Sequence, residues 1–89
     1  MPSGPFFFDY NVSMPVINNA RFNCEDIFID YPFEEVMFHW DYKQKKVYRR
    51  FYGDLHEEVV PYENRLFNDA ILEGDEVPRE FYMKGKPKT

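Results

Sequence analysis

The sequence predicts an α+β fold, a small antiparallel sheet of three to five strands in a meander with one covering helix near residues 61–73. Alternating hydrophobic and polar residues at 36–42 and 47–52 flank a short polar link, which is typical of a β-hairpin. A further extended run follows, and after it apolar residues recur at helical spacing. At 89 residues, the chain has room for a single domain, 1–89.

The first 23 residues are predicted to form an N-terminal arm with one short strand. Prolines and turn-forming residues punctuate this region, and 6–10 is its strand candidate. We expect the arm either to pack as an edge strand or to dock on a partner. The next run, 26–31, is rich in β-branched and aromatic residues, which predicts a strand that ends before Pro32.

The central hairpin is predicted from the parity of its residues. Val36, Phe38 and Trp40 share one face of the first strand, since strand side chains alternate. Residues 43–46 supply the polar link to the second strand. A third strand is predicted at 55–60, and its two glutamates make it the weakest of the three. One face of the sheet is expected to lie under the helix, and the other to be solvated or to meet a partner.

The helix is predicted over 61–73. Pro61 suits the first helical position, where its missing N–H costs nothing. Gly74 is placed to cap the last turn. Beyond it we expect extended chain, then an anchor on the sheet at 81–83 and a frayed tail at 84–89. The apolar stripe of this helix comprises Tyr62, Leu66, Phe67, Ala70 and Ile71.

Composition narrows the class of protein. The net charge is −5, and Cys24 is the single cysteine, which excludes an internal disulfide framework and a cysteine-based zinc site. No apolar run approaches the roughly 20 residues that span a bilayer. Residues 1–8 lack the pattern of a signal peptide. We therefore expect a cytoplasmic protein with no membrane partner.

The chain offers few groups for catalysis or metal binding. Its two histidines, His39 and His56, lack the spacing of a compact metal motif. The acid pairs 34–35 and 57–58 each split across the sheet, because neighbouring strand residues point to opposite faces. We therefore expect no enzyme, no catalytic residue, no cofactor and no metal site. Whether the two histidines have a function stays open.

Binding is the function that the aromatic content favours. Aromatic residues make up 20% of the chain, more than so small a core is expected to hold, and they are enriched at interface centres. One predicted protein-binding surface is the sheet face with Tyr48, Arg50 and Tyr52. We expect the double variant Arg50→Glu, Tyr52→Ala to lose its partner and stay folded. A second predicted surface is the acidic-aromatic stretch 26–35, with Asp26, Asp30, Tyr31, Glu34 and Glu35.

Charge is distributed unevenly along the chain. Residues 1–42 carry seven acids and one base, a net charge of −6, whereas residues 43–89 carry nine acids and ten bases, a net charge of +1. A small acidic domain with exposed aromatics suits a basic protein surface, because complementary charges speed association. The sequence therefore predicts a small acidic non-enzymatic protein-binding domain, an inhibitor, an immunity-type protein or an accessory interaction protein.

Two alternatives remain open. A basic, aromatic hairpin at 43–52 is typical of single-stranded nucleic-acid binding, although the net negative charge argues against it. A homodimer that pairs its edge strands is the other alternative. The predicted nucleic-acid residues are Lys43, Lys45, Lys46, Arg49 and Arg50.

The chain carries Trp-Asp at 40–41, a Val-Pro step at 60–61, and Ala70 and Gly74 at the end of the predicted helix. In this order these residues resemble the KTSC domain, a strand meander that leads into a short helix. The serine of that family between its Ala and Gly is absent here, where 71–73 read Ile-Leu-Glu. The shared features are generic, so the resemblance implies a meander and a helix but no activity.

Overall fold

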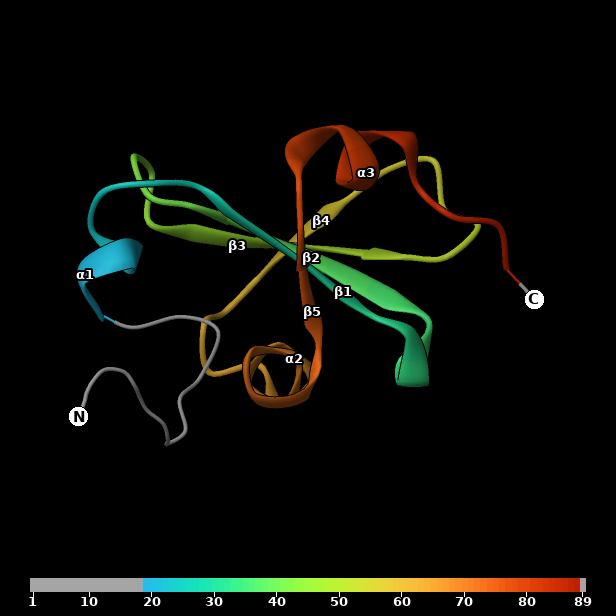
Figure 1. Cartoon of the computed structure of the whole chain (residues 1–89), viewed down its shortest axis with the longest axis horizontal. Helices are drawn as coiled ribbons and strands as arrows, with labels where there is room; N and C mark the ends of the chain where they lie inside the picture. Colours follow the sequence, from blue (N-terminus) through green and yellow to red (C-terminus); the bar gives the residue numbers. More distant parts are fainter. Residues whose placement is uncertain (1–18, 89) are drawn as a thin grey trace, which may run out of the picture.

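A five-stranded antiparallel sheet in the order β4-β3-β2-β1-β5 organises the protein (Figure 1). The computed structural model describes residues 19–88, so the predicted strand at 6–10 lies outside the described residues. The predicted α+β class is confirmed. Within the described part of the chain, no helix is long and apolar enough to cross a membrane.

The hairpin and the strand before it are confirmed, and the later strands differ from the prediction. The strand predicted at 55–60 is shorter because 52–57 form turns and bends. The fifth strand was not predicted as part of the sheet, yet it pairs with β1 through Phe28 and Val77. The strands are β1 Ile27–Tyr31, β2 Val36–Asp41, β3 Lys46–Phe51, β4 Glu58–Val60 and β5 Asp75–Val77.

The covering helix begins later than predicted. Asn64, and not Pro61, marks its start, because the Asn64 side chain accepts a 3.1 Å hydrogen bond from the Phe67 amide. The predicted cap at Gly74 is confirmed, since its amide donates to the Ala70 carbonyl at 2.7 Å. The helices are α1 Asn19–Phe22, the 3₁₀ turn η1 Pro32–Glu34, α2 Arg65–Glu73 and α3 Arg79–Lys84.

Helices α2 and α3 cover opposite faces of the sheet (Figure 1). The expectation that one face would be solvated or meet a partner is therefore wrong for the centre of that face, which lies under α3. We call the layer under α2 the first core, and it includes Ile29, Phe38, Trp40 and Phe67. The second core, under α3, comprises Phe28, Met37, Tyr52 and Tyr82.

The C-terminal stretch beyond α3 returns to the end of β3. The Gly53 amide donates to the Lys86 carbonyl at 2.7 Å, and the Lys86 ammonium lies 3.6 Å from the Asp30 carboxylate. This ammonium also lies 4.9 Å from the centre of the Tyr52 ring. The tail predicted to fray at 84–89 is thus anchored at Lys86.

Candidate protein-binding surface

Of the first predicted surface, Tyr52 lies in the second core, and Tyr48 and Arg50 are half-buried. Tyr52 is 5% exposed, and its hydroxyl donates to the carboxylate of Asp30, 4% exposed, at 2.6 Å. The Tyr48 ring stacks on His39 with 5.4 Å between ring centres. The three residues Tyr48, Arg50 and Tyr52 share a face as predicted, and α3 covers the part of that face at Arg50 and Tyr52.

Arg50 holds the end of α3 onto the sheet. Its guanidinium donates to the carbonyls of Tyr82 at 2.8 Å, Met83 at 3.0 Å and Asp54 at 3.1 Å. Gly85 ends the helix with a φ of +76°, and a Cβ there would lie 2.6 Å from the Arg50 guanidinium. The Arg50 side chain therefore occupies the space beside the C-terminal end of α3.

A polar cluster extends from Asp26 through the second core. The amide of Tyr42 donates to this carboxylate at 3.2 Å, His39 Nε2 lies 3.1 Å from it, and Arg79 donates at 3.3 Å. Burial raises the pKa of Asp26, but these contacts outweigh burial and hold the pKa below its usual value. Asp26 therefore serves the fold and is half-buried.

His39 is buried between aromatic rings. Its ring stacks on Phe28 with 4.4 Å between centres, and its Nδ1 lies 4.0 Å from Glu57 without a hydrogen-bond partner. The Tyr82 hydroxyl donates to the same Glu57 carboxylate at 2.6 Å. Among the residues that the structure describes, no three His, Cys, Asp or Glu side chains are grouped so as to hold a metal ion.

The basic residues of the hairpin do not form one row. Lys43, Lys45 and Lys46 are exposed. Arg49, in contrast, pairs with Glu58 at 2.7 Å, and the Arg50 guanidinium is bound to backbone carbonyls under α3. Of the five residues predicted for nucleic acid, the three lysines are therefore exposed together at the β2–β3 turn, and the two arginines are engaged elsewhere.

The residues of the second predicted surface differ in exposure on the two sides of the start of the β1–β2 turn. Tyr31 is buried, and its hydroxyl donates to Glu73 at 3.3 Å. Glu34, in contrast, is exposed. Glu35 has a left-handed φ of +53°, and its amide donates to the Pro32 carbonyl at 3.0 Å, which closes the turn.

Phe33, at the centre of this turn, lies within the predicted stretch 26–35 but was not named among its contact residues. It is 82% exposed, so it projects from the surface without burying its ring. A phenylalanine between Pro32, which ends the strand, and an acidic pair was the available signal. An exposed aromatic in that position fits a contact residue better than a core residue.

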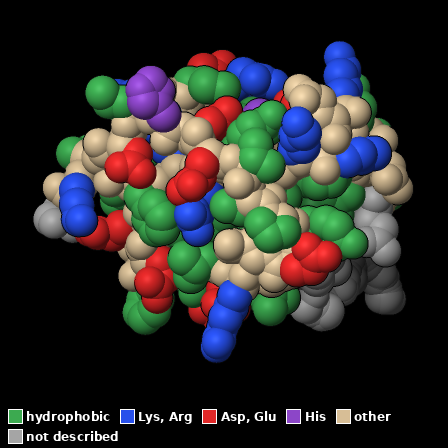
Figure 2. Space-filling model, turned by 180° about the vertical axis from the view of Figure 1, so that it is seen from behind, with side chains coloured by type: hydrophobic (Ala, Val, Ile, Leu, Met, Phe, Trp, Pro, Cys, Tyr) green, Lys and Arg blue, Asp and Glu red, His purple; other side chains and the backbone are tan. Residues whose placement is uncertain are grey.

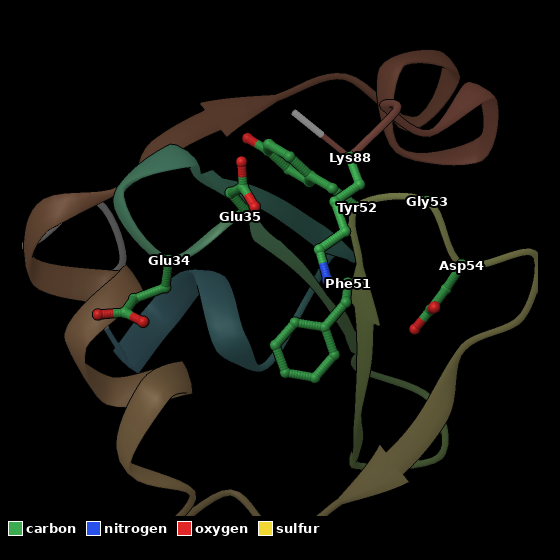
Figure 3. A pocket seen from close by; sticks show the side chains of 7 residues that line it. All are labelled: Glu34, Glu35, Phe51, Tyr52, Gly53, Asp54 and Lys88. Atoms are coloured by element: carbon green, nitrogen blue, oxygen red, sulfur yellow. The ribbon is translucent and has the colours of Figure 1, made fainter.

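A hollow of about 580 Å³ lies beside this turn (Figure 3). The carboxylates of Glu34 and Glu35 come from the turn, and Asp54 comes from the segment after β3. Burial is the main cause that raises the pKa of Tyr52 in this hollow, and the nearby carboxylates of Asp30 and Glu35 add to it. The lining residues are Glu34, Glu35, Phe51, Tyr52, Gly53, Asp54 and Lys88.

The rest of the visible surface mixes residue types. Figure 2 shows acidic, basic and hydrophobic side chains interspersed over the back of the molecule. Exposed hydrophobic residues occur elsewhere too, including Leu55, Tyr62 and Leu72. The turn thus stands out because an exposed aromatic, exposed carboxylates and a hollow meet there. Such an arrangement suits contact with another macromolecule.

Comparison with known proteins gives one family. A family model described as Tis1 immunity protein matches residues 14–86. The Immune protein Tis1 of Pseudomonas aeruginosa (strain UCBPP-PA14) is 45% identical over 76 residues, which cover 84% of this chain and 99% of that relative.

A solved structure agrees with this match. The crystal structure of the complex between the type VI effector Tas1 and its immunity protein contains a chain that aligns with a TM-score of 0.78 and 45% identity. The alignment covers 83% of this chain and 99% of that chain. The matched family differs from the KTSC domain that part of the sequence resembles. The chain therefore belongs to the Tis1 immunity protein family, and the predicted immunity-type, protein-binding role is confirmed.

Proposed function

We propose that this chain binds and neutralises a type VI effector related to Tas1. The observation that carries the proposal is the similarity to an immunity protein solved in complex with Tas1, over 99% of that protein's length. A shared fold at 45% identity supports a shared class of partner. The two proteins differ at more than half of the aligned positions, so each is expected to prefer its own effector.

The chain is proposed to act by binding, with no reaction of its own. Two of the described groups that are suited to acid–base chemistry, His39 and Asp26, are engaged in the fold. His39 is buried against Phe28, and Asp26 is held by an amide, an imidazole and a guanidinium. The hollow beside the β1–β2 turn contains carboxylates and one lysine, without histidine, serine or cysteine. This set favours electrostatic contact over nucleophilic catalysis.

Co-expression tests the proposal directly. The Tas1-like effector from the same source is induced in a sensitive host, with and without this chain. We expect growth to be restored by the chain, and the two proteins to co-purify as a complex of defined mass. Continued growth arrest together with no complex would contradict the proposal.

The host cell and the purified chain also serve to test two predictions made from the sequence. Fractionation of the host cell tests the predicted cytoplasmic location, which stays a prediction. The mass of the free chain in solution tests the predicted homodimer, and a mass of 10.9 kDa would identify a monomer.

A further inference from the structure

We propose that the effector contacts the chain at the turn surface, defined as Phe33 with the carboxylates of Glu34, Glu35 and Asp54. The partner surface that fits is an apolar recess bordered by Lys or Arg side chains. This inference rests on the proposed function, since it names where the neutralised effector binds. It is carried by an exposed aromatic ring on a rigid turn, and the charge around that ring indicates the chemistry of the partner.

Phe33 projects from a turn that is tightly held. The turn η1 joins two paired strands, with Tyr31 and Val36 in register at its base. The Glu35 amide donates to Pro32 at 3.0 Å, and the Glu35 carbonyl accepts from the Tyr52 amide at 2.9 Å. An aromatic side chain on a fixed backbone has few rotors to immobilise, so its burial in a partner is favourable.

The charge around Phe33 is negative. Glu34 and Asp54 are exposed, and Lys88 is the one basic residue that lines the hollow. The pKa of Tyr31 is raised, first by burial and then by the carboxylates of Glu73, Asp69 and Glu34. Glu73, Asp69 and Glu34 thus place negative charge near Tyr31 at this end of the sheet. A basic rim on the partner would complement it and speed association.

The chain provides a matched control at the opposite end of the sheet. Pro32-Phe33-Glu34 has a counterpart in Pro61-Tyr62-Glu63, another proline–aromatic–glutamate sequence. Tyr62 is 65% exposed and borders a groove with Lys45, at the β2–β3 end. The two sites share residue types and exposure but differ in surrounding charge. Of these two sites, the proposal predicts that the turn surface contributes to effector binding and the Tyr62 site does not.

The test measures the affinity and association rate of the full chain for the Tas1-like effector from the same source. Phe33→Ser is expected to raise the Kd at least about 30-fold, as loss of a buried aromatic contact does. Glu34→Gln is expected to slow association about threefold in low salt with little effect on dissociation. Tyr62→Ser and Glu63→Gln should each stay within about twofold of wild type. Circular dichroism checks that all four variants, at exposed positions, remain folded.

Each outcome separates the two proposals. If the wild-type chain does not bind the effector, the proposed function is wrong. If the wild-type chain binds, and Phe33→Ser and Glu34→Gln bind as tightly and as fast as wild type, the proposed function stands and the inference about the turn surface is wrong. Loss of binding in Tyr62→Ser instead would place the contact at the opposite end. If Phe33→Ser converts a free dimer into a monomer, the ring serves self-association, which also overturns this inference.

Discussion

Gly74 lies where helix α2 passes directly over strand β1. A Cβ at this position would lie 2.7 Å from the Ala70 carbonyl oxygen, 2.8 Å from an Ile29 methyl group and 2.9 Å from the Asp30 carbonyl oxygen. Its φ of −84° is open to any residue, so the requirement is for space. Close approach of backbone to backbone is thus the reason for glycine here.

Gly74→Ala is expected to lower the free energy of unfolding by about 2 kcal/mol, because two backbone oxygens must move to admit the methyl group. Urea unfolding followed by Trp40 fluorescence measures the loss. Leu72→Ala, at an exposed helical position, serves as the control and should change stability by less than about 0.5 kcal/mol. Equal stability of the two variants would show that the helix end has room to shift.

Asp26 predicts a dependence of stability on pH. Its folded-state pKa lies below the value of about 3.9 expected in the unfolded chain, so the carboxylate stabilises the fold above that pH. This contribution is lost as the pH falls through the folded pKa. We expect Asp26→Asn to cost about 2 kcal/mol at pH 7 and the difference from wild type to shrink below about pH 4. Unfolding free energies measured from pH 7 to pH 3 test this, and a constant difference would contradict it.

At the scale of elements, α3 depends on two side chains of the β3 strand and its end. Arg50 binds the last carbonyls of the helix, and Tyr52 packs in the second core with its hydroxyl on Asp30. These contacts support a different expectation for Arg50→Glu, Tyr52→Ala, namely that the double variant destabilises the domain. The double variant removes a carbonyl-binding cation and a buried ring under one helix.

We expect Arg50→Glu, Tyr52→Ala to lose at least about 3 kcal/mol of stability, since it leaves a half-buried carboxylate facing carbonyls and a cavity in place of the buried Tyr52 ring. Thermal unfolding by circular dichroism measures this loss. The variant Lys43→Ala, Lys46→Ala, at exposed positions of the same hairpin, serves as the control and should change stability by less than about 0.5 kcal/mol. An unchanged melting temperature in the first variant would show that α3 is held by other contacts.

Elements with strong side-chain alternation were predictable, and those set by tertiary contacts were not. The hairpin alternates along both strands, and the predicted parity of Phe38 and Trp40 is the one observed. Strand β5 reads Asp-Glu-Val, a sequence with weak strand propensity, and it forms because its backbone pairs with β1. Helix α2 starts after Pro61 because a capping side chain at Asn64 competes with proline for the first turn.

The exposure of the predicted contact residues was harder to predict from sequence than the strands. Residue type favoured Tyr48, Arg50 and Tyr52, yet exposure depends on what packs above the sheet, and α3 comes from a distant part of the sequence. Glu34 remained accessible because it lies in a turn between strands. Phe33 looks like a core residue by type, and its exposure follows from the direction of the 3₁₀ turn. The class of protein was predicted from the size, net charge and aromatic content of the chain, which do not depend on which side chains are exposed.

At the scale of the whole molecule, two cores share one set of strands. Neighbouring residues belong to different cores, as Val36, Met37 and Phe38 show. Neither helix can leave without exposing a face of the same strands. The structure therefore predicts a single cooperative unfolding transition for the described part of the chain.

Met37→Ala in the second core is expected to cost about 3 kcal/mol, because the side chain is fully buried. Trp40 fluorescence reports on the first core, and the ring signal of His39 in NMR spectra reports on the second. In urea, both midpoints should fall together by the same amount. Separate midpoints for the two probes would show that the helices come apart independently.

The unequal polarity of the two layers has a consequence for how the strands find their partners. Phe38 and Trp40 point into an apolar layer, whereas His39 points into one that contains Asp30 and the Tyr52 hydroxyl. Shifting the register of β2 by one residue would exchange these environments. The His39 imidazole would then lie in the apolar layer, and the rings of Phe38 and Trp40 would lie in the layer that contains the Asp30 carboxylate. A sheet with two equally apolar faces would tolerate that register shift. Here the difference in polarity between the two faces favours the correct register of β2 over a shifted one during folding.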